Sequence, residues 1–129
     1  MNEQLQRADI LFEQKRWQQA LEAYQNYLAE FPDDAHVLCQ IARCYLKLEL
    51  FGEASAYASQ AAASEPDYSY AYYIQSYVFH VRNLHEDARR SIEQALALEP
   101  TNPDYHVLLG RLKAHNRDWN GAVSAAETA

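Results

Sequence analysis

The chain alternates between segments in which apolar residues recur every three or four positions and short breaks, several of which contain proline or glycine. In segment 35–48 the apolar residues that recur at three- and four-residue steps are Val37, Leu38, Ile41, Cys44, Tyr45 and Leu48. This spacing gives an amphipathic helix one apolar face. The sequence LFGE then breaks the pattern, and a second helix is expected over about 53–64, which Pro66 ends. The pattern predicts a helix–turn–helix unit, and Asp67 is a suitable N-cap for the helix that follows it.

This unit recurs along the chain with a period of 34 residues. Three prolines with that spacing are Pro32, Pro66 and Pro100, and four alanines with the same spacing are Ala20, Ala54, Ala88 and Ala122. Small residues also recur in phase, as Ala8, Ala42, Ser76 and Gly110. Self-similarity at this period indicates a helical repeat array. Two antiparallel helices approach closely where one of them presents a small side chain, which gives the recurring small residues a packing role.

The phase of the pattern divides the chain into four rows, which we call repeats 1 to 4. They comprise residues 1–34, 35–68, 69–102 and the partial repeat 103–129. We expect one domain over 1–129, all-α, with seven full helices and a shortened eighth arranged in antiparallel pairs as a right-handed superhelix. Only three glycines and four prolines occur, too few turn-forming residues for a sandwich or barrel of many strands.

The repeating positions resemble those of the tetratricopeptide repeat (TPR) family. That family has a small residue at position 8, an aromatic residue near position 11, alanine at position 20 and proline at position 32 of each 34-residue unit. Repeat 2 carries the resemblance best, with Leu38, Ile41, Ala42, Tyr45, Ala54, Ala58, Ala61 and Pro66. Four residues depart from the family pattern, of which Gln4 and Arg7 replace apolar residues of repeat 1. Gln75 replaces an apolar residue and needs a hydrogen-bond partner if it is buried, and Lys113 replaces the aromatic residue of repeat 4.

Charge and composition narrow the classes of partner and compartment. A net charge of −7 argues against nucleic acid as a partner. The longest segment without Asp, Glu, Lys or Arg is 68–81, which is short of the ~20 residues that span a bilayer. The N-terminal sequence has no apolar run of the kind a signal peptide needs. Cys39 and Cys44 match no metal-site or local disulfide spacing, so two free thiols favour a reducing compartment, the cytoplasm.

No residue pattern points to catalysis or to a cofactor. The sequence has no glycine-rich phosphate loop and no GxSxG, HExxH or CxxC motif, and no two of its five histidines are four residues apart. Its histidines and carboxylates fit exposed or packed positions on helices. We therefore expect a protein that is not an enzyme and that uses no cofactor or metal.

Function is then expected in the concave surface of the array. The resemblance implies that positions 2, 5, 6, 9, 12 and 13 of each repeat line this groove. The candidate site residues at these positions are His36, Gln40, Arg43, Lys47, Tyr70, Tyr73, Ile74, Tyr77 and Arg111. The three tyrosines stand at i, i+3 and i+7, so they form one stripe on a helix face, joined by Ile74. In repeats 2 to 4 the groove positions carry three cations against one acid, Asp104. Together these features predict a protein or peptide partner with apolar or aromatic anchors and some acidic character.

One binding mode of the family depends on particular residue types in the groove. Repeats that hold the C-terminal carboxylate of chaperone tails use Lys, Asn and Arg at five groove positions. The matching residues here are Leu5, Asp9, Gln40, Tyr70 and Ile74. Only the amide of Gln40 is a plausible substitute, and Asp9 would repel a carboxylate. The resemblance therefore implies that this clamp is absent.

Two alternatives to a peptide-binding scaffold stay open. Repeat 4 ends inside its second helix, with no polar capping helix behind it, and such an end exposes apolar surface unless more chain or another copy covers it. The chain could then be a self-assembly module that forms a homo-oligomer through its ends or its convex face, or the N-terminal TPR part of a longer protein.

Overall fold

The computed structural model describes residues 3–114, which contain helices and no strand. The helices are α1 (Glu3–Glu13), α2 (Trp17–Glu30), α3 (Ala35–Lys47), α4 (Phe51–Ser64), α5 (Ser69–Val81) and α6 (His85–Leu98), and residues 103–114 are also helical. The pairing of two helices per repeat is as predicted, and α4 begins two residues earlier than expected. The shortened eighth helix of the prediction lies outside the described residues.

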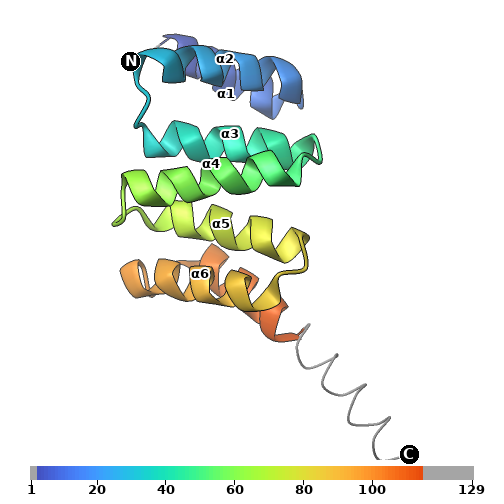
Figure 1. Ribbon diagram of the computed structural model, residues 1–129, viewed down its shortest axis with the longest axis vertical. Coiled ribbons are helices and arrows are strands. Elements are labelled where there is room, and N and C mark those ends of the chain that lie inside the picture. Colours follow the sequence, from blue (N-terminus) through green and yellow to red (C-terminus); the bar gives the residue numbers. More distant parts are fainter. Residues whose placement is uncertain (1–2, 115–129) are drawn as a thin grey trace, which may run out of the picture.

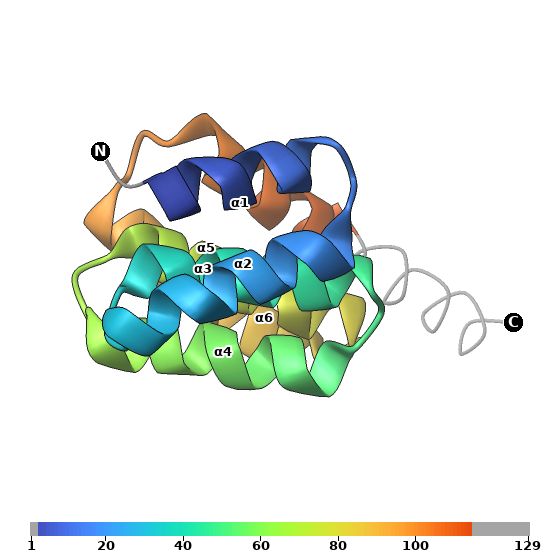
Figure 2. The same ribbon diagram turned by 90° about the horizontal axis from the view of Figure 1, so that it is seen from above.

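The helix pairs stack along the long axis of the molecule, with α1 and α2 at one end (Figure 1). Each helix packs against its neighbours in the chain, and α3 also contacts α5, the first helix of the next repeat. The view along the stack shows α1 near one edge and α4 at the opposite edge, with α2, α3 and α5 overlapping between them (Figure 2). First helices of successive repeats adjoin one another, because α3 contacts α5 and Arg43 of α3 lies over the Phe12 ring of α1. We call the surface that they form the inner surface.

Small residues lie where the helices approach most closely. The residues at positions 8 and 20 of repeats 1 to 3 are all fully buried: Ala8, Ala20, Ala42, Ala54, Ser76 and Ala88. At one of these contacts the Ser76 hydroxyl donates a hydrogen bond of 2.6 Å to the carbonyl oxygen of Ala88. Gly110 has open space around it within the described part, and the helix expected to face it lies outside that part.

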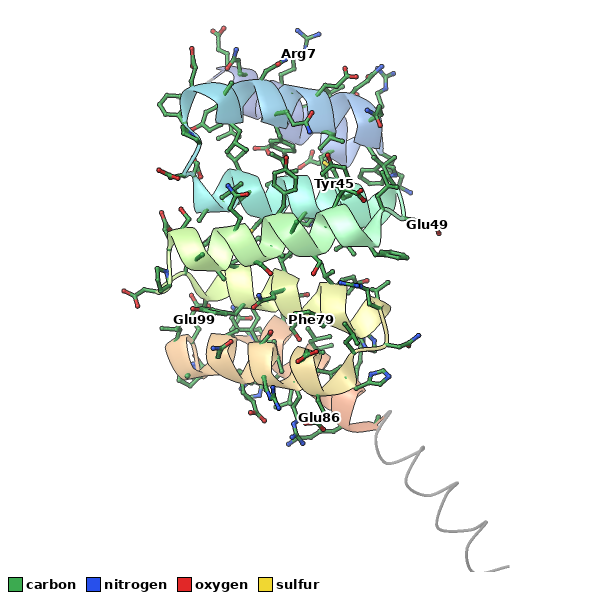
Figure 3. The ribbon with its side chains drawn as sticks, in the orientation of Figure 1. Arg7, Tyr45, Glu49, Phe79, Glu86 and Glu99 are labelled. Carbon is green, nitrogen blue, oxygen red and sulfur yellow. The ribbon has the colours of Figure 1, made fainter. Side chains whose placement is uncertain are left out.

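Helix α3 is buried on two sides, which joins the repeats into one core. Leu38 packs with α4 and α5, while Ile41 packs with α1 and α2. Tyr45 points into the space between the first and second pairs (Figure 3). Its ring stacks on that of Tyr57 at 5.5 Å, and its hydroxyl accepts a hydrogen bond of 3.2 Å from Gln25. Large residues thus fill the gaps that the small residues leave.

Gln75, which departs from the family pattern, has the partners that its half-buried position requires. Its amide nitrogen donates to the hydroxyl of Ser59 at 3.2 Å, and its amide oxygen accepts from the hydroxyl of Ser91 at 3.2 Å. These serines belong to α4 and α6. The polar residue at this position therefore links three consecutive helices instead of leaving a buried group unsatisfied.

The turn inside each described repeat uses a left-handed backbone at position 15. Lys15, Glu49 and Asn83 have φ values of 63°, 61° and 63°. After α3, the amide of Glu49 donates to the carbonyl of Leu46, and the amide of Leu50 donates to that of Tyr45. This pair of bonds is the Schellman arrangement that closes a helix C-terminus, where glycine is usual.

We expect Glu49→Gly to stabilise the fold. An L-residue with positive φ carries a steric cost of ~1–2 kcal/mol, part of which is offset because glycine gains freedom in the unfolded chain. The free energy of unfolding should rise by about 0.5 kcal/mol, measured by urea denaturation. Glu22→Gly, at an exposed position within α2, is the matched control and should lower it by about 1 kcal/mol. Equal losses in both variants would contradict this account of the turn.

The helix starts correct one expectation. Asp34 is the N-cap of α3 and accepts a hydrogen bond from the amide of Val37, and Asn102 accepts from two amides at the start of helix 103–114. The N-cap of α5, however, is Tyr68 and not Asp67, and Tyr68 makes no side-chain cap bond. The prediction that Asp67 caps this helix is wrong, because the N-cap falls at position 34 of each repeat, one residue later.

Candidate functional site

The inner surface is hollowed between α3, α5 and the start of helix 103–114. This hollow has a volume of about 520 Å³, within the range of ~300–1,000 Å³ typical of ligand sites. We call it the tyrosine hollow. Its lining consists of Arg43, Leu46, Lys47, Glu49, Phe51, Tyr70, Tyr73, Ile74, Tyr77, Val81 and Asp104. Six of the nine candidate residues from the sequence therefore meet in one concavity.

Aromatic rings run in a row along the wall of the tyrosine hollow. Tyr70 lies 5.9 Å from both Tyr68 and Tyr73, and Tyr73 stacks on Tyr105 at 5.1 Å, measured between ring centroids. The hydroxyl of Tyr105 shares a hydrogen bond of 3.0 Å with the hydroxyl of Ser69. Sequence reasoning missed Tyr68 and Tyr105, since neither stands at a groove position. The row holds Tyr70 and Tyr73 in fixed orientations.

The tyrosine stripe differs in detail from the one expected. Ile74 is buried, with 3% of its surface exposed, so it belongs to the core and only reaches the floor of the hollow. Tyr77 is 36% exposed and stands outside the row of ring contacts among the described residues. Tyr70 and Tyr73 are half-buried. The accessible aromatic surface of the hollow therefore includes the three tyrosines, together with the half-buried Phe51.

A second hollow adjoins the first between α1 and α3. We call it the N-terminal hollow; its volume is about 430 Å³. Its lining is Asp9, Phe12, Glu13, Lys15, Trp17, His36, Gln40, Arg43 and Lys47. It contains His36 and Gln40, two further candidate residues. The linings of the two hollows share Arg43 and Lys47, so these cations stand at the boundary between them.

Both boundary cations lie against aromatic rings. The guanidinium carbon of Arg43 is 4.4 Å from the centre of the Phe12 ring, and the Lys47 amine is 5.6 Å from that of Trp17. Arg43 also donates a hydrogen bond of 3.1 Å to the side-chain oxygen of Gln40. Cation–π contacts and this hydrogen bond hold both charges in place on the groove side of α3.

Arg111 lines neither hollow. It is exposed on helix 103–114, and its charge acts to lower the pKa of Tyr73. Burial is the larger influence and raises that pKa, with Asp104 adding to the rise. The tyrosine hollow itself is bordered by two cations and two carboxylates, Glu49 and Asp104, so the excess of positive charge expected from the groove positions is not a property of its full lining.

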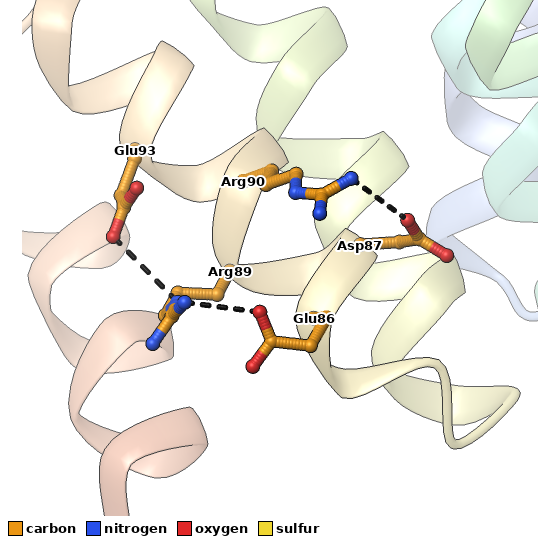
Figure 4. A network of polar contacts seen from close by, with 5 residues as sticks. All are labelled: Glu86, Asp87, Arg89, Arg90 and Glu93. Carbon is orange, nitrogen blue, oxygen red and sulfur yellow. Dashed lines mark hydrogen bonds and ion pairs between the residues drawn. The ribbon is translucent and has the colours of Figure 1, made fainter.

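The ion pairs of the described residues lie elsewhere, on α6. Arg89 pairs with Glu86 at 3.0 Å and with Glu93 at 3.8 Å, and Arg90 pairs with Asp87 at 3.9 Å (Figure 4). All are neighbours on one exposed helix, where such pairs contribute little to stability. In residues 3–114 neither Arg43 nor Lys47 has a carboxylate within ion-pair distance.

No group of three or more metal-ligating side chains occurs in the described part of the chain. Both cysteines are free and fully buried, and burial raises the pKa of each thiol to about 12, which makes them poor nucleophiles. No helix within residues 3–114 has the length and apolar character needed to cross a bilayer.

Two tyrosines have a pKa that burial raises, so we expect the protein to lose stability at alkaline pH. Burial raises the pKa of Tyr24 and of Tyr68, and a hydrogen bond to Asp9 adds to the rise for Tyr24. Above about pH 10 the unfolded chain loses these protons while the folded chain keeps them. The free energy of unfolding should therefore fall as pH rises past 10, and more gently in Tyr24→Phe. Urea midpoints that stay constant between about pH 9 and pH 11 would contradict this assignment.

Comparison with known proteins identifies the family. Two family models, both described as tetratricopeptide repeat, match residues 11–76 and 81–129. The chain therefore belongs to the tetratricopeptide repeat family. Among curated proteins, serine/threonine-protein phosphatase T of Aspergillus oryzae is 29% identical over 98 residues, which cover 76% of this chain. The chain spans only 20% of the length of that phosphatase.

Solved structures support the fold. The TPR domain of Sgt2 from Aspergillus fumigatus superposes with a TM-score of 0.86 at 18% identity, covering 91% of this chain and 79% of that one. The first TPR of Spaghetti (RPAP3), bound to the HSP90 peptide SRMEEVD, gives a TM-score of 0.81 at 21% identity, covering 87% and 89%. At these identities the likeness establishes the TPR solenoid and carries no residue roles.

Proposed function

We propose that this chain is a non-catalytic protein-interaction module that binds an extended segment of a partner protein along its inner surface. The observation that carries the proposal is the tyrosine hollow, in which Tyr70, Tyr73 and Tyr77 keep aromatic surface accessible inside a concavity. Rigid aromatic side chains in such a place bury much area at little cost in side-chain entropy, so they are favourable binding anchors. The Spaghetti (RPAP3) structure, which holds a chaperone peptide, supports the same class of ligand.

Selection from a library of random extended peptides tests this proposal. The full chain serves as bait, and Tyr73→Ala/Tyr77→Ala serves as the counter-selection. We expect enriched peptides to carry a large apolar or aromatic residue and to lose binding to the double variant. Peptides that bind both proteins equally would overturn the proposal. If light scattering showed the chain forming oligomers that cover the groove, the self-assembly alternative would replace it.

The mode of capture should differ from the chaperone-tail clamp, because Leu5, Asp9, Gln40, Tyr70 and Ile74 occupy the matching positions. Asp9 accepts a hydrogen bond from the hydroxyl of Tyr24, and its charge there disfavours a carboxylate. We expect no preference for SRMEEVD with a free C-terminus over the same peptide with an amidated one, measured by calorimetry. A preference of about tenfold or more, which is 1.4 kcal/mol, would show that the clamp is present after all.

The phosphatase activity in the name of the curated relative is not proposed for this chain, which matches a fifth of that protein. The cytoplasm, favoured by two free thiols, stays a prediction, as does the division into three full repeats and a partial fourth.

A further inference from the structure

The boundary between the two hollows differs from the rest of the groove in its charge. The carboxylates of the tyrosine hollow are Glu49 and Asp104, which do not line the N-terminal hollow. Those of the N-terminal hollow, Asp9 and Glu13, do not line the tyrosine hollow. Where the hollows meet, the charged side chains common to both are cationic. The two hollows thus meet at two cations, and each of the four carboxylates lines one hollow only.

A chain of polar contacts holds one of these cations from behind. The Tyr24 hydroxyl donates to a carboxylate oxygen of Asp9, and the Gln40 amide nitrogen donates to the Tyr24 oxygen at 3.4 Å. The side-chain oxygen of Gln40 accepts a hydrogen bond from Arg43, whose guanidinium lies over the ring of Phe12. Gln40 is buried, with 7% of its surface exposed. Arg43 also hydrogen-bonds the Tyr70 side chain. Arg43 is therefore oriented before any ligand arrives, and within the described residues it has no carboxylate at ion-pair distance.

Lys47 stands one helical turn beyond Arg43 on the same face of α3, since residues four apart on a helix are neighbours. It is exposed and rests on Trp17. Two cations four residues apart on one helix face, with no carboxylate of the described residues within ion-pair distance, suit one anionic group. A guanidinium can bind a carboxylate through two parallel hydrogen bonds, and the ammonium adds a point charge.

The distance from the two cations on α3 to the tyrosines on α5 sets the spacing between the residues of a bound segment that reach each of them. Helices α3 and α5 are in contact, and packed helices have axes about 8–10 Å apart. An extended chain advances about 3.3 Å per residue, so it crosses from α3 to α5 in about three residues.

We propose that Arg43 and Lys47 receive a carboxylate of the bound segment, and that this acidic residue stands about two to four positions from the side chain that fills the tyrosine hollow. The inference rests on the proposed function and names the ligand class: an extended peptide with an acidic residue and an aromatic or large apolar residue at fixed spacing. Gln40 is the positioning residue for Arg43.

The experiment uses the selected peptides, resynthesised with amidated C-termini so that side-chain carboxylates are the acids present. Each acidic residue is replaced by its amide, and affinities are measured by calorimetry with wild type, Arg43→Gln and Lys47→Gln. Arg90→Gln, an exposed arginine on α6, is the matched control. Melting curves confirm that each variant is folded, and the exposed Lys47 gives a variant with little effect on packing.

At one acidic position, about two to four residues from the anchor, we expect the amide substitution to weaken binding to wild type about tenfold. The same substitution should weaken binding to Arg43→Gln and to Lys47→Gln by a clearly smaller factor, because one of the two partner charges is already gone. Its effect should shrink at high salt. Arg90→Gln should behave as wild type.

Two outcomes would overturn the inference: selected peptides without an acidic residue at this spacing, or equal loss with wild type and Arg43→Gln. In either case the peptides would still lose affinity for Tyr73→Ala/Tyr77→Ala, so the proposed function would stand. Peptides indifferent to that double variant would instead remove the proposed function itself.

Discussion

Tyr73→Ala should weaken the binding of a groove peptide about thirtyfold or more, which corresponds to ~2 kcal/mol. Tyr73 is half-buried at the wall of the tyrosine hollow, where its ring stacks on Tyr105 at 5.1 Å and lies 5.9 Å from Tyr70. The ring is therefore held in place before binding, and its removal takes away both contact area and the orientation of its neighbours. Interface energy concentrates in a few such side chains.

The measurement is a calorimetric titration of each variant with one selected peptide. Arg89→Ala and Glu93→Ala are the controls, since these residues pair with each other on the exposed face of α6 (Figure 4). They should bind as wild type does. Lys47→Ala should have a smaller effect than Tyr73→Ala, and one that fades at high salt. Binding that survives loss of Tyr73 and Tyr77 but fails in the α6 variants would move the site to the outer face.

Ala54→Leu should lower the free energy of unfolding by about 2 kcal/mol, within the ~1–3 kcal/mol that overpacking a core costs. Ala54 is fully buried at position 20 of repeat 2, where α4 approaches α3. A larger side chain there must push two helices apart. Urea denaturation followed by circular dichroism measures the change.

Ala56→Leu tests whether the loss comes from the contact and not from the residue type. Ala56 is exposed on the same helix, two residues away, and alanine and leucine differ little in helix propensity. The control should change stability by less than about 0.5 kcal/mol. An Ala54→Leu variant as stable as wild type would mean that the repeat has been placed in the wrong phase.

The repeat pattern predicted the helices because one constraint acts at every 34th residue. Ala20, Ala54 and Ala88 are small for the same reason, and their burial follows from the phase alone. Gln75 was predicted to need partners on the same grounds, and it has them on two adjacent helices. What repeats in the sequence could therefore be predicted.

Features that no recurring residue type marks could not be predicted. The left-handed residues Lys15 and Glu49 are not glycines, so nothing in their identity marks the turn. Tyr105 of repeat 4 joins the aromatic row because its ring lies beside that of Tyr73 in repeat 3. The spacing of residues within one helix does not reveal a contact between two repeats. The burial of Ile74 likewise depends on how closely α5 packs against α3. These are properties of tertiary packing.

Chemical-shift mapping tests most directly whether a partner segment lies along the inner surface. Isotope-labelled chain is titrated with a selected peptide while the backbone amide signals are followed. We expect the shifts to concentrate on α3, α5 and the start of helix 103–114, around Arg43, Tyr73 and Tyr77. Shifts concentrated on the outward faces of α2, α4 and α6, with these three residues unmoved, would contradict it.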